Sequence, residues 1–394
     1  MREAVIVSTA RTPIGKAYRG AFNDTQAQAL VGHVIGEAVK RAGIEPGEVE
    51  DVVIGAALQQ GSTGFNIARQ GAMRAGLPVS VSGMSVDRQC ASGMMAIATA
   101  AKQIMHDGMD VAVGGGVESI SLVQNEKQNG YRAVDPWLWE HMPQLYMKMI
   151  ETAEIVAERY QVSREDQDRF AYESQQKAIK AIERNVFAEQ IVPIPVEKVR
   201  WEGTTKHVTA TTFARDELPR AETTLEGLAK LRPAFKPTGT VTAGNASPYS
   251  DGSAAVIVMN REKAEASGIK PIARLVTYAV AGIDPDIMGV GPILAIPKAL
   301  KKAGLTLDQI DLIEFNEAFA AQALAVAREL KMDLAKVNVN GGAIALGHPL
   351  GATGAKLTAQ LVHELRKRGG GLGMVTMCVG GGMGAAGIFE VYGA

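Results

Sequence analysis

The sequence predicts an α/β fold with two similar halves, and three observations support this class. Apolar runs typical of strands alternate with helical patterns, the order expected of a sheet covered by helices. The 43 glycines gather where these runs meet loops, which marks turns and close backbone approach. Parts of the chain also repeat at a constant spacing. The strand-like runs are 4–8, 52–55, 111–114 and 254–259, and the helical patterns include 26–42 and 93–106.

The repeat has the same offset, 261 residues, in two separate places. An Ala-Gly pair followed by a turn and a strand begins at Ala42 and returns at Ala303. A glycine, a helix, a second glycine and a strand follow from Gly93 and again from Gly354. Because two landmarks share one register, we expect a duplicated unit whose packed mixed sheets form a layered core. The first half comprises residues 1–118 and 249–270, and the second comprises 271–394.

Residues 119–248 interrupt the first half and differ in character from both halves. They contain Trp137 and Trp139, an amphipathic pattern over 152–160, and the Ser-x-x-acid signal of a helix start at Ser163 and Asp166. A long insertion on a rigid scaffold is a usual place for substrate binding, and it also suits an assembly surface. The two tryptophans fit an oligomer contact or a loop packed on its own domain.

Composition excludes several classes of protein. The 394 residues are 46% hydrophobic, enough for a sizeable core, and the net charge of -1 creates no field for nucleic acid or an anionic membrane. The N-terminal residues lack the basic and apolar regions of a secretion signal, and no apolar run has the length of a spanning helix. We therefore expect a cytoplasmic protein with no membrane or nucleic-acid partner.

Cys90 lies between a short strand and the helix expected from about Ser92. A cysteine at a helix N-terminus has its thiolate stabilised by the helix dipole and by free backbone N–H groups. The position therefore favours a nucleophile. An inert buried cysteine fits the same local sequence, because cysteine is among the most often buried residues.

His348 stands in a glycine-rich loop, directly before Pro349, ahead of a helix expected from about Ala352. The proline keeps this histidine out of helical geometry, and the glycines let the backbone approach a ligand. An imidazole in such a loop is suited to deprotonating a thiol. A structural or solvent-facing histidine is the alternative.

Cys378 follows a strand expected at 372–377 and opens a run of glycines that begins at Gly380. Backbone N–H groups in such a run can stabilise a developing oxyanion, although a buried cysteine at a strand end fits equally well. Asn316 also ends an expected strand, where its amide can hold a water or a carbonyl oxygen, or cap a helix.

Metal and disulfide chemistry fit these residues poorly. A zinc site needs about four ligands, and neither cysteine has a second cysteine or a histidine close to it in sequence. A disulfide between Cys90 and Cys378 is possible by count but disfavoured in a reducing compartment. We expect two free thiols with separate tasks and no metal.

Taken together, the motifs resemble the thiolase family along essentially the whole chain. The resemblance implies two similar α/β halves with a loop domain inserted in the first, in agreement with the repeat. The motifs that carry it are Ser8-Thr9-Ala10-Arg11-Thr12-Pro13, Cys90-Ala91-Ser92-Gly93, Ala243-Gly244-Asn245-Ala246-Ser247, Asn316-Glu317-Ala318-Phe319, the segment from Gly341 to Pro349, and Cys378-Val379-Gly380-Gly381-Gly382.

The resemblance implies a role for each catalytic residue. Cys90 becomes acylated after His348 activates its thiol, and Cys378 moves the proton at the α-carbon. One oxyanion hole uses His348 and a water held by Asn316, and the other uses the backbone N–H groups of Cys90 and Gly380. An acyl-enzyme divides the reaction into easier steps, and two thiols separate the nucleophile from the acid/base.

The resemblance also implies that coenzyme A and acyl-CoA are substrates, with no permanently bound cofactor, and that the protein is a homodimer or homotetramer. Among the matching positions, Arg220 suits the nucleotide end of coenzyme A, and Ser247 suits its pantetheine amides. The positions that match the family's binding pattern are Arg220, Phe235, Ala243, Ser247, Phe319 and Met149.

Departures from the family pattern bear on the acyl group. Lys148 stands where biosynthetic relatives have histidine, and Ile150 adds a branched side chain where relatives have glycine. Gly227 and Pro248 change the expected contacts with coenzyme A. The segments 88–93 and 288–297 look more like degradative 3-ketoacyl-CoA thiolases, so we expect the broader enzyme. The alternatives are an acetyl-CoA acetyltransferase limited to acetoacetyl-CoA, and an inactive acyl-CoA-binding subunit.

Overall fold

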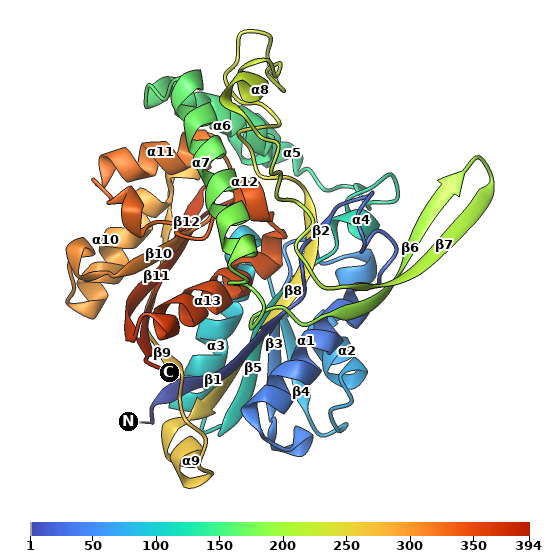
Figure 1. Ribbon diagram of the computed structural model, residues 1–394, viewed down its shortest axis with the longest axis vertical. Helices are drawn as coiled ribbons and strands as arrows, with labels where there is room; N and C mark the ends of the chain where they lie inside the picture. The colour runs from blue at the N-terminus through green and yellow to red at the C-terminus, as the bar shows by residue number, and fades with distance from the viewer. Residues whose placement is uncertain (1) are drawn as a thin grey trace.

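The computed structural model describes residues 2–394 and contains one long mixed sheet that separates layers of helices (Figure 1). Its strand order is β10-β11-β12-β9-β1-β8-β5-β3-β4, and the short strand β2 pairs with β8. The strands are β1 Ala4–Arg11, β2 Gly15–Lys16, β3 Asp51–Gly55, β4 Ser82–Val86, β5 Val111–Glu118, β8 Ser250–Asn260, β9 Ala273–Gly282, β10 Leu312–Phe315, β11 Gly370–Val379 and β12 Met383–Tyr392.

The sheet divides into two halves with the same internal order. In the first, β3 is parallel to β5, and β5, β8 and β1 follow in antiparallel pairs. In the second, β10 is parallel to β11, and β11, β12 and β9 follow in antiparallel pairs. The halves join where Ile6 of β1 pairs with Ala273 of β9. The expected fold of two similar α/β halves is confirmed.

The offset of 261 residues is visible in the element boundaries. Helix α1 ends at Ala42 and α10 ends at Ala303, each followed by a glycine with φ near +70°. Strand β3 then begins at Asp51 and β10 at Leu312. A left-handed residue at a helix end favours glycine because it lacks a Cβ, which explains why this landmark is readable in the sequence.

Three apolar clusters define the layers. Helices α1 and α2 pack on the outer face of the first half-sheet, α10 and α11 pack on the outer face of the second, and α3 and α13 lie between the two (Figure 1). Burial of apolar surface on both faces of the sheet accounts for its nearly continuous hydrophobic strands. The helices are α1 Ala27–Ala42, α2 Ile67–Arg74, α3 Ser92–His106, α10 Pro292–Ala303, α11 Ala320–Glu329, α12 Ala343–Leu346 and α13 Leu350–Lys367.

The central helices α3 and α13 touch at equivalent glycines. A Cβ added to Gly93 would lie 2.7 Å from the Gly351 carbonyl oxygen, and one added to Gly354 would lie 2.4 Å from the Met94 nitrogen. Side chains at either position would push the helices apart. The second landmark of the repeat therefore marks the close crossing of these two helices.

The insertion forms most of the upper part of the molecule in Figure 1, with a β6–β7 hairpin that projects from one side. Helix α6 begins at Met149, three residues before the expected start, and Ser163 caps α7 by accepting from the Asp166 N–H. The Asp166 carboxylate binds Arg328. The elements are α4 Ile120–Val123, α5 Pro136–His141, α6 Met149–Arg159, α7 Arg164–Glu183, β6 Ile194–Glu202, β7 Thr205–Phe213 and α8 Leu225–Ala229, with α9 Arg261–Ala266 after β8.

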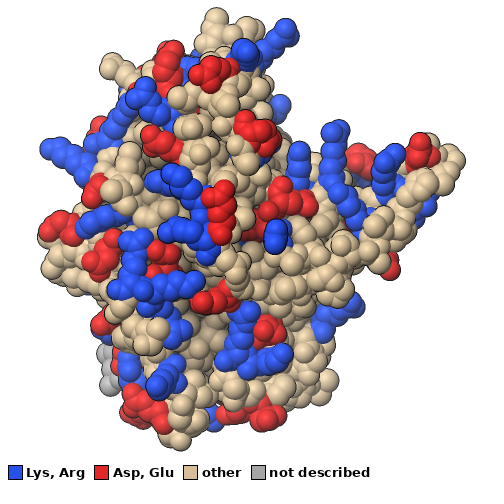
Figure 2. Space-filling view, viewed as in Figure 1, with Lys and Arg blue, Asp and Glu red and all other residues tan. Residues whose placement is uncertain are grey.

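Basic and acidic side chains are interspersed over the face seen in Figure 2. This distribution agrees with the balance of 41 basic and 42 acidic residues in the whole chain. Within residues 2–394, no helix combines the length and apolarity needed to cross a membrane.

Candidate active site

Cys90 lies in a short 3-10 helix, Gln89–Ala91, that leads directly into α3. The turn is fixed by Ser92, whose hydroxyl donates to the Gln89 carbonyl at 2.6 Å and accepts from the Arg88 N–H at 2.8 Å. Gln89 itself has φ +45°, a conformation that costs free energy for a residue with a side chain. The sequence thus holds the cysteine on a tight, pre-formed turn at the start of a buried helix.

The Cys90 thiol is buried, with 8% of its surface exposed. Burial raises its pKa to about 12, opposed by hydrogen bonds to the sulfur from the backbone N–H groups of Gly380 and of Cys90 itself. The free protein therefore holds Cys90 as a thiol at neutral pH. The same two N–H groups converge at the place where an oxyanion next to this sulfur would form.

His348 is held at both ring nitrogens and at its backbone. Its Nδ1 lies 2.6 Å from Thr353 Oγ1, its Nε2 lies 3.3 Å from Asn316 Nδ2, and its N–H donates to Ser250 Oγ. With the Asn316 amide in this orientation, its Nδ2 donates to Nε2, and the ring proton is then on Nδ1. Burial, together with the positive charge of Lys356, lowers the pKa of His348 to about 3. The imidazole is therefore neutral, with a lone pair on Nε2.

Asn316 follows β10 directly, and its N–H donates to the Thr376 carbonyl of β11. The side chain is fully buried, and its Oδ1 has no hydrogen-bond partner among residues 2–394. The helix after it, α11, begins at Ala320 with Phe319 at its N-cap. The alternative of a capping asparagine is therefore wrong, and the buried amide faces His348 instead.

Cys378 is inside β11, where it pairs with Gly384 of β12, rather than after the strand as the sequence suggested. The difference arises because β11 extends to Val379. The thiol is fully buried against Met288 and Ala318. Burial raises its pKa well above the ordinary value, and the charge of an ionised Cys90 raises it further. The two cysteines are thus electrostatic neighbours, although 288 residues separate them in the chain.

The structure brings four of the expected catalytic groups into two close pairs. Gly380 meets Cys90, and His348 meets Asn316, while Cys378 interacts with Cys90. A neutral imidazole, two buried thiols and convergent N–H donors can deprotonate a nucleophile, stabilise an oxyanion and move a second proton. This combination suits acyl transfer.

The residues expected to bind coenzyme A occupy three places. Arg220 and Ala243 line one hollow, whose other lining residues include Leu228 and Pro248. Ser247 donates its N–H to the Ala318 carbonyl, and Phe319 pairs with Ala246, so these two residues lie beside the Asn316 segment. The third place is formed by Met149 at the start of α6, where its sulfur lies 3.7 Å from a Cβ placed on Gly380.

Phe235 lies on the surface, outside the hollow formed by Arg220 and Ala243, with 47% of its side chain exposed. The neighbouring Ala234 donates its N–H to the Val241 carbonyl, two residues before Ala243. The N–H of Gly227 donates to Thr224 Oγ1 at 3.0 Å, the side chain that caps α8. The backbone N–H of Gly227 is therefore already used within α8.

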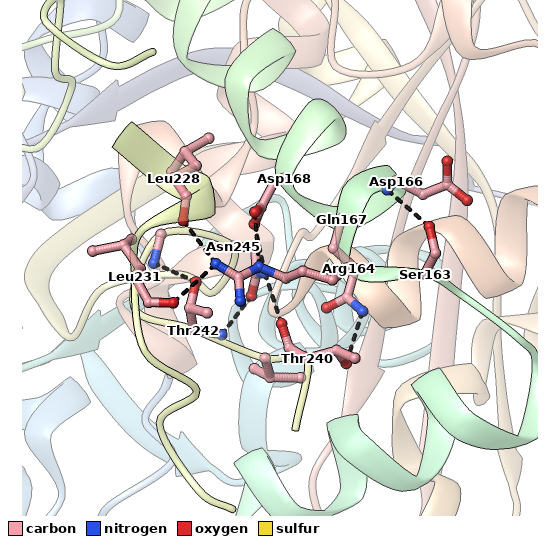
Figure 3. A network of polar contacts seen from close by, with 12 residues as sticks. Ser163, Arg164, Asp166, Gln167, Asp168, Leu228, Leu231, Thr240, Thr242 and Asn245 are labelled. Carbon is pink, nitrogen blue, oxygen red and sulfur yellow. Dashed lines mark hydrogen bonds and ion pairs between the residues drawn. The ribbon is translucent and has the colours of Figure 1, made fainter. Parts of the chain in front are cut away.

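Sequence reasoning missed a polar network that holds the segment around Ala243 (Figure 3). Asn245 is fully buried, donates to Asp168 Oδ1 at 3.0 Å and accepts from the Thr242 N–H at 2.8 Å. Arg164 pairs with the other oxygen of Asp168 and donates to carbonyls of α8 and the loop after it, at Leu228 and Leu231. Helix α7 therefore fixes the expected coenzyme A segment through side chains.

Two further residues that shape the site were also missed. Thr353 orients the His348 ring, and Glu118, at the end of β5, accepts from the N–H of Gly351 in the first turn of α13. Glu118 also accepts from Ala57 and Leu58, so one carboxylate ties both halves together. The spacing of Thr353 five residues after His348 was a usable signal, whereas the contacts of Glu118 leave no local pattern.

Comparison with known proteins gives one consistent result. Residues 4–262 match the family described as Thiolase, N-terminal domain, and residues 269–391 match Thiolase, C-terminal domain. The chain is 49% identical to a 3-ketoacyl-CoA thiolase of Bacillus subtilis, over 99% of this chain and 100% of that protein. It is 46% identical to an acetyl-CoA acetyltransferase of Pseudomonas aeruginosa, over 98% of each.

Solved structures agree with the sequence matches. The crystal structure of the Bacillus anthracis acetyl-CoA acetyltransferase superposes with a TM-score of 0.87, at 45% identity over 99% of both chains. The crystal structure of human mitochondrial 3-ketoacyl-CoA thiolase also gives 0.87, at 40% identity over 99% of both chains.

Proposed function

The chain belongs to the thiolase family and is an acyltransferase of the thiolase type, and from this premise we propose that it cleaves 3-oxoacyl-CoA through an acyl group carried on Cys90. Coenzyme A is the second substrate, and the products are acetyl-CoA and a shortened acyl-CoA. The reverse reaction is a Claisen condensation. The observation that carries the proposal is the buried Cys90 thiol on a tight turn at the start of α3, with hydrogen bonds to its sulfur from the Gly380 and Cys90 N–H groups.

In the first step, His348 Nε2 takes the proton of the Cys90 thiol as the sulfur attacks the 3-keto carbon. The neutral state of the imidazole and the location of its proton on Nδ1 support this role. The resulting Nε2–H can then donate to the oxyanion. The bond between C2 and C3 breaks, which leaves the shortened acyl group on Cys90 and the enolate of acetyl-CoA.

In the second step, Cys378 donates its proton to C2 of the enolate, and acetyl-CoA leaves. The raised pKa of Cys378 supports this assignment, because a thiol that stays protonated at neutral pH is available as an acid. The Cys378 thiolate then takes the proton of an incoming coenzyme A thiol. The resulting coenzyme A thiolate attacks the acyl group on Cys90, and the Cys90 sulfur leaves. His348 returns its proton to this sulfur, which regenerates the Cys90 thiol and the neutral imidazole.

We assign coenzyme A to the surface between the insertion and the second half. Arg220 and Ala243, which line one small hollow, are assigned to the outer part of coenzyme A, and Ser247 and Phe319 lie beside the Asn316 segment. Met149 reaches the acyl end near Gly380. The limits 119 and 248 are our proposal for the inserted domain.

We propose that the acyl range extends beyond C4. The 49% identity to a 3-ketoacyl-CoA thiolase supports this choice, whereas several relatives at 42–46% are named acetyl-CoA acetyltransferases and favour a C4-specific enzyme as the second candidate. Rates of CoA-dependent cleavage should be measured with 3-oxoacyl-CoA substrates of C4 to C12. Comparable kcat/KM values for C4 and longer chains support the proposal, and activity confined to C4 contradicts it.

For assembly and location, we propose a cytoplasmic homodimer or homotetramer. Trp137 and Trp139 are 62% and 58% exposed on α5, which favours a contact with a second copy over packing within the insertion. Light scattering during size-exclusion chromatography tests this proposal. A single species with the mass of one chain would contradict it.

A further inference from the structure

Lys356 is a buried cation that the reaction steps above do not use. It lies in the second turn of α13 with 1% of its surface exposed. A buried ammonium is costly unless hydrogen bonds and opposite charges compensate it. Its Nζ donates to the carbonyl oxygen of Gly347 at 3.3 Å. Gly347 is the residue directly before His348.

Charged groups from several elements face this ammonium. Glu314 of β10 is buried, and its Oε2 has no hydrogen-bond partner among residues 2–394. Glu317, which is also buried, follows the same strand, and the Arg11–Asp216 ion pair lies beyond with Nη1–Oδ1 at 2.8 Å. Burial and Arg11 lower the pKa of Lys356, while Asp216 and the two glutamates raise it. Burial raises the pKa of Glu314, and Lys356 lowers it.

Helix α13 therefore holds His348 from both sides. Thr353, on the first turn, binds the ring at Nδ1, and Lys356, nearly one turn further, binds the preceding carbonyl. Gly347 has φ +85° and ψ 156°, which is available to glycine but gives this peptide unit considerable freedom. A charge-assisted hydrogen bond to its carbonyl fixes the peptide plane that sets the direction of the imidazole.

We propose that Lys356 is a positioning residue for the general base: its hydrogen bond fixes the Gly347 peptide and with it the direction of the His348 imidazole. Its positive charge adds to burial, the larger cause, in disfavouring the imidazolium. The proposal rests on the proposed role of His348 as base. It assigns a task in catalysis to a helix residue that need not contact the substrate.

The test uses variants that separate charge from stability. Lys356→Met removes the charge and the donor. Lys356→Met with Glu314→Gln also removes the charge of Glu314, the carboxylate whose Oε2 has no other partner among residues 2–394. Lys356→Arg retains the charge and the hydrogen-bond donors. Lys336→Met is the matched control, because Lys336 also binds backbone carbonyls, at Asp308 and Ile310, far along the chain from His348.

We expect kcat to fall about tenfold or more in both Lys356→Met proteins, with the KM for coenzyme A changed less than about threefold. The acid limb of kcat/KM should move up by about one pH unit, because the pKa of His348 rises when the cation is removed. Lys356→Arg should stay near the parent in the pH profile. Lys336→Met should lose only thermal stability.

An unchanged acid limb in either folded Lys356→Met protein would overturn the proposal. Failure of both proteins to fold would assign Lys356 to stability alone and would also overturn it. His348→Asn separates this result from a failure of the proposed function. If that variant keeps full activity, His348 is not the base. If it is inactive while Lys356→Met is normal, only the role of Lys356 is wrong.

Discussion

The two halves of the molecule share a scaffold but contribute different chemistry. With the offset of 261 residues, Cys378 of β11 corresponds to Val117 of β5, and Asn316 corresponds to Gly55. Cys90 corresponds to Gly351. The two halves have the same strand order and corresponding helix ends. They differ in the residue types at their strand ends and helix starts. In the proposed mechanism, the first half supplies the nucleophile, and the second supplies most of the groups that act on it.

Small residues at strand ends of the first half make room for the two central helices, α3 of the same half and α13 of the second. A Cβ on Gly55 would lie 2.2 Å from the Ser92 carbonyl carbon, and one on Gly116 would lie 2.2 Å from the Gly351 oxygen. These contacts let α3 and α13 approach the strand ends closely. These glycines of the first half are therefore required for a site to which the second half contributes most of the groups.

The largest expected effect concerns the two cysteines. Cys90→Ala and Cys378→Ala should each lower turnover by about 10³-fold or more, because one removes the acyl carrier and the other the acid/base. Steady-state assays in the cleavage direction measure the loss, and circular dichroism checks the fold. A Cys378→Ala protein with more than about a tenth of the parent kcat would show that Cys378 is not the acid/base.

The shared scaffold is tested at the crossing of α3 and α13. Gly93→Ala and Gly354→Ala should each destabilise the protein by about 1–3 kcal/mol, since the added Cβ meets backbone atoms of the other helix. Thermal unfolding provides the comparison. Gly36→Ala in α1 is the control, because its Cβ would have 3.7 Å to the nearest atom, and it should stabilise slightly. Equal shifts for all three variants would contradict the account.

Only the first half carries an insertion. Substitution of Asn245 tests whether the polar network of this insertion supports coenzyme A binding. Asn245→Ala should raise the KM for coenzyme A about tenfold, because the loss of its buried hydrogen bonds frees the segment around Ala243. Ser163→Ala removes the cap of α7 without touching that segment and should cost only about 1 kcal/mol of stability. An unchanged KM in Asn245→Ala would separate the network from coenzyme A binding.

The last expected effect concerns pH and Glu118, which corresponds to Val379 of the second half. Burial raises its pKa to about 7 from 4.5, so the folded state binds the extra proton. This contribution to stability is complete below pH 4.5 and is lost as pH rises through 7, by about 3 kcal/mol at most. Glu118→Gln should therefore raise the Tm relative to the parent more at pH 8 than at pH 5.

The control for this pH effect is Glu37→Gln, which changes a partly exposed carboxylate that pairs with Arg41 on α1. It should show the same Tm difference from the parent at both pH values. A Glu118→Gln protein that behaves like this control would show that the buried carboxylate does not favour its protonated form.

The sequence allowed the fold to be predicted because its landmarks are local. Gly43 and Gly304 mark helix ends through their positive φ, and the register between them is visible without a structure. The start of α3 after Cys90 was predicted for the same reason. The end of β11 was not, because Val379 continues the pairing with Met383 of β12, and no residue type in the strand signals its last pair.

The hydrogen bonds that hold the segments around the catalytic residues could not be predicted, because they join residues far apart in the sequence. Glu118 binds Gly351, and Asn245 binds Asp168, across 233 and 77 residues of chain. Polar residues at such positions fit a solvated surface equally well when only the sequence is known. Only the folded backbone distinguishes these alternatives.

Mapping the acyl group after incubation with acetyl-CoA tests the central claim most directly. Peptide mass spectrometry should find a single acetyl group on Cys90 in the parent and in Cys378→Ala, and none on Cys90→Ala. An acetyl group on Cys378, or a parent protein that binds coenzyme A without forming any adduct, would contradict the division of labour between the two halves.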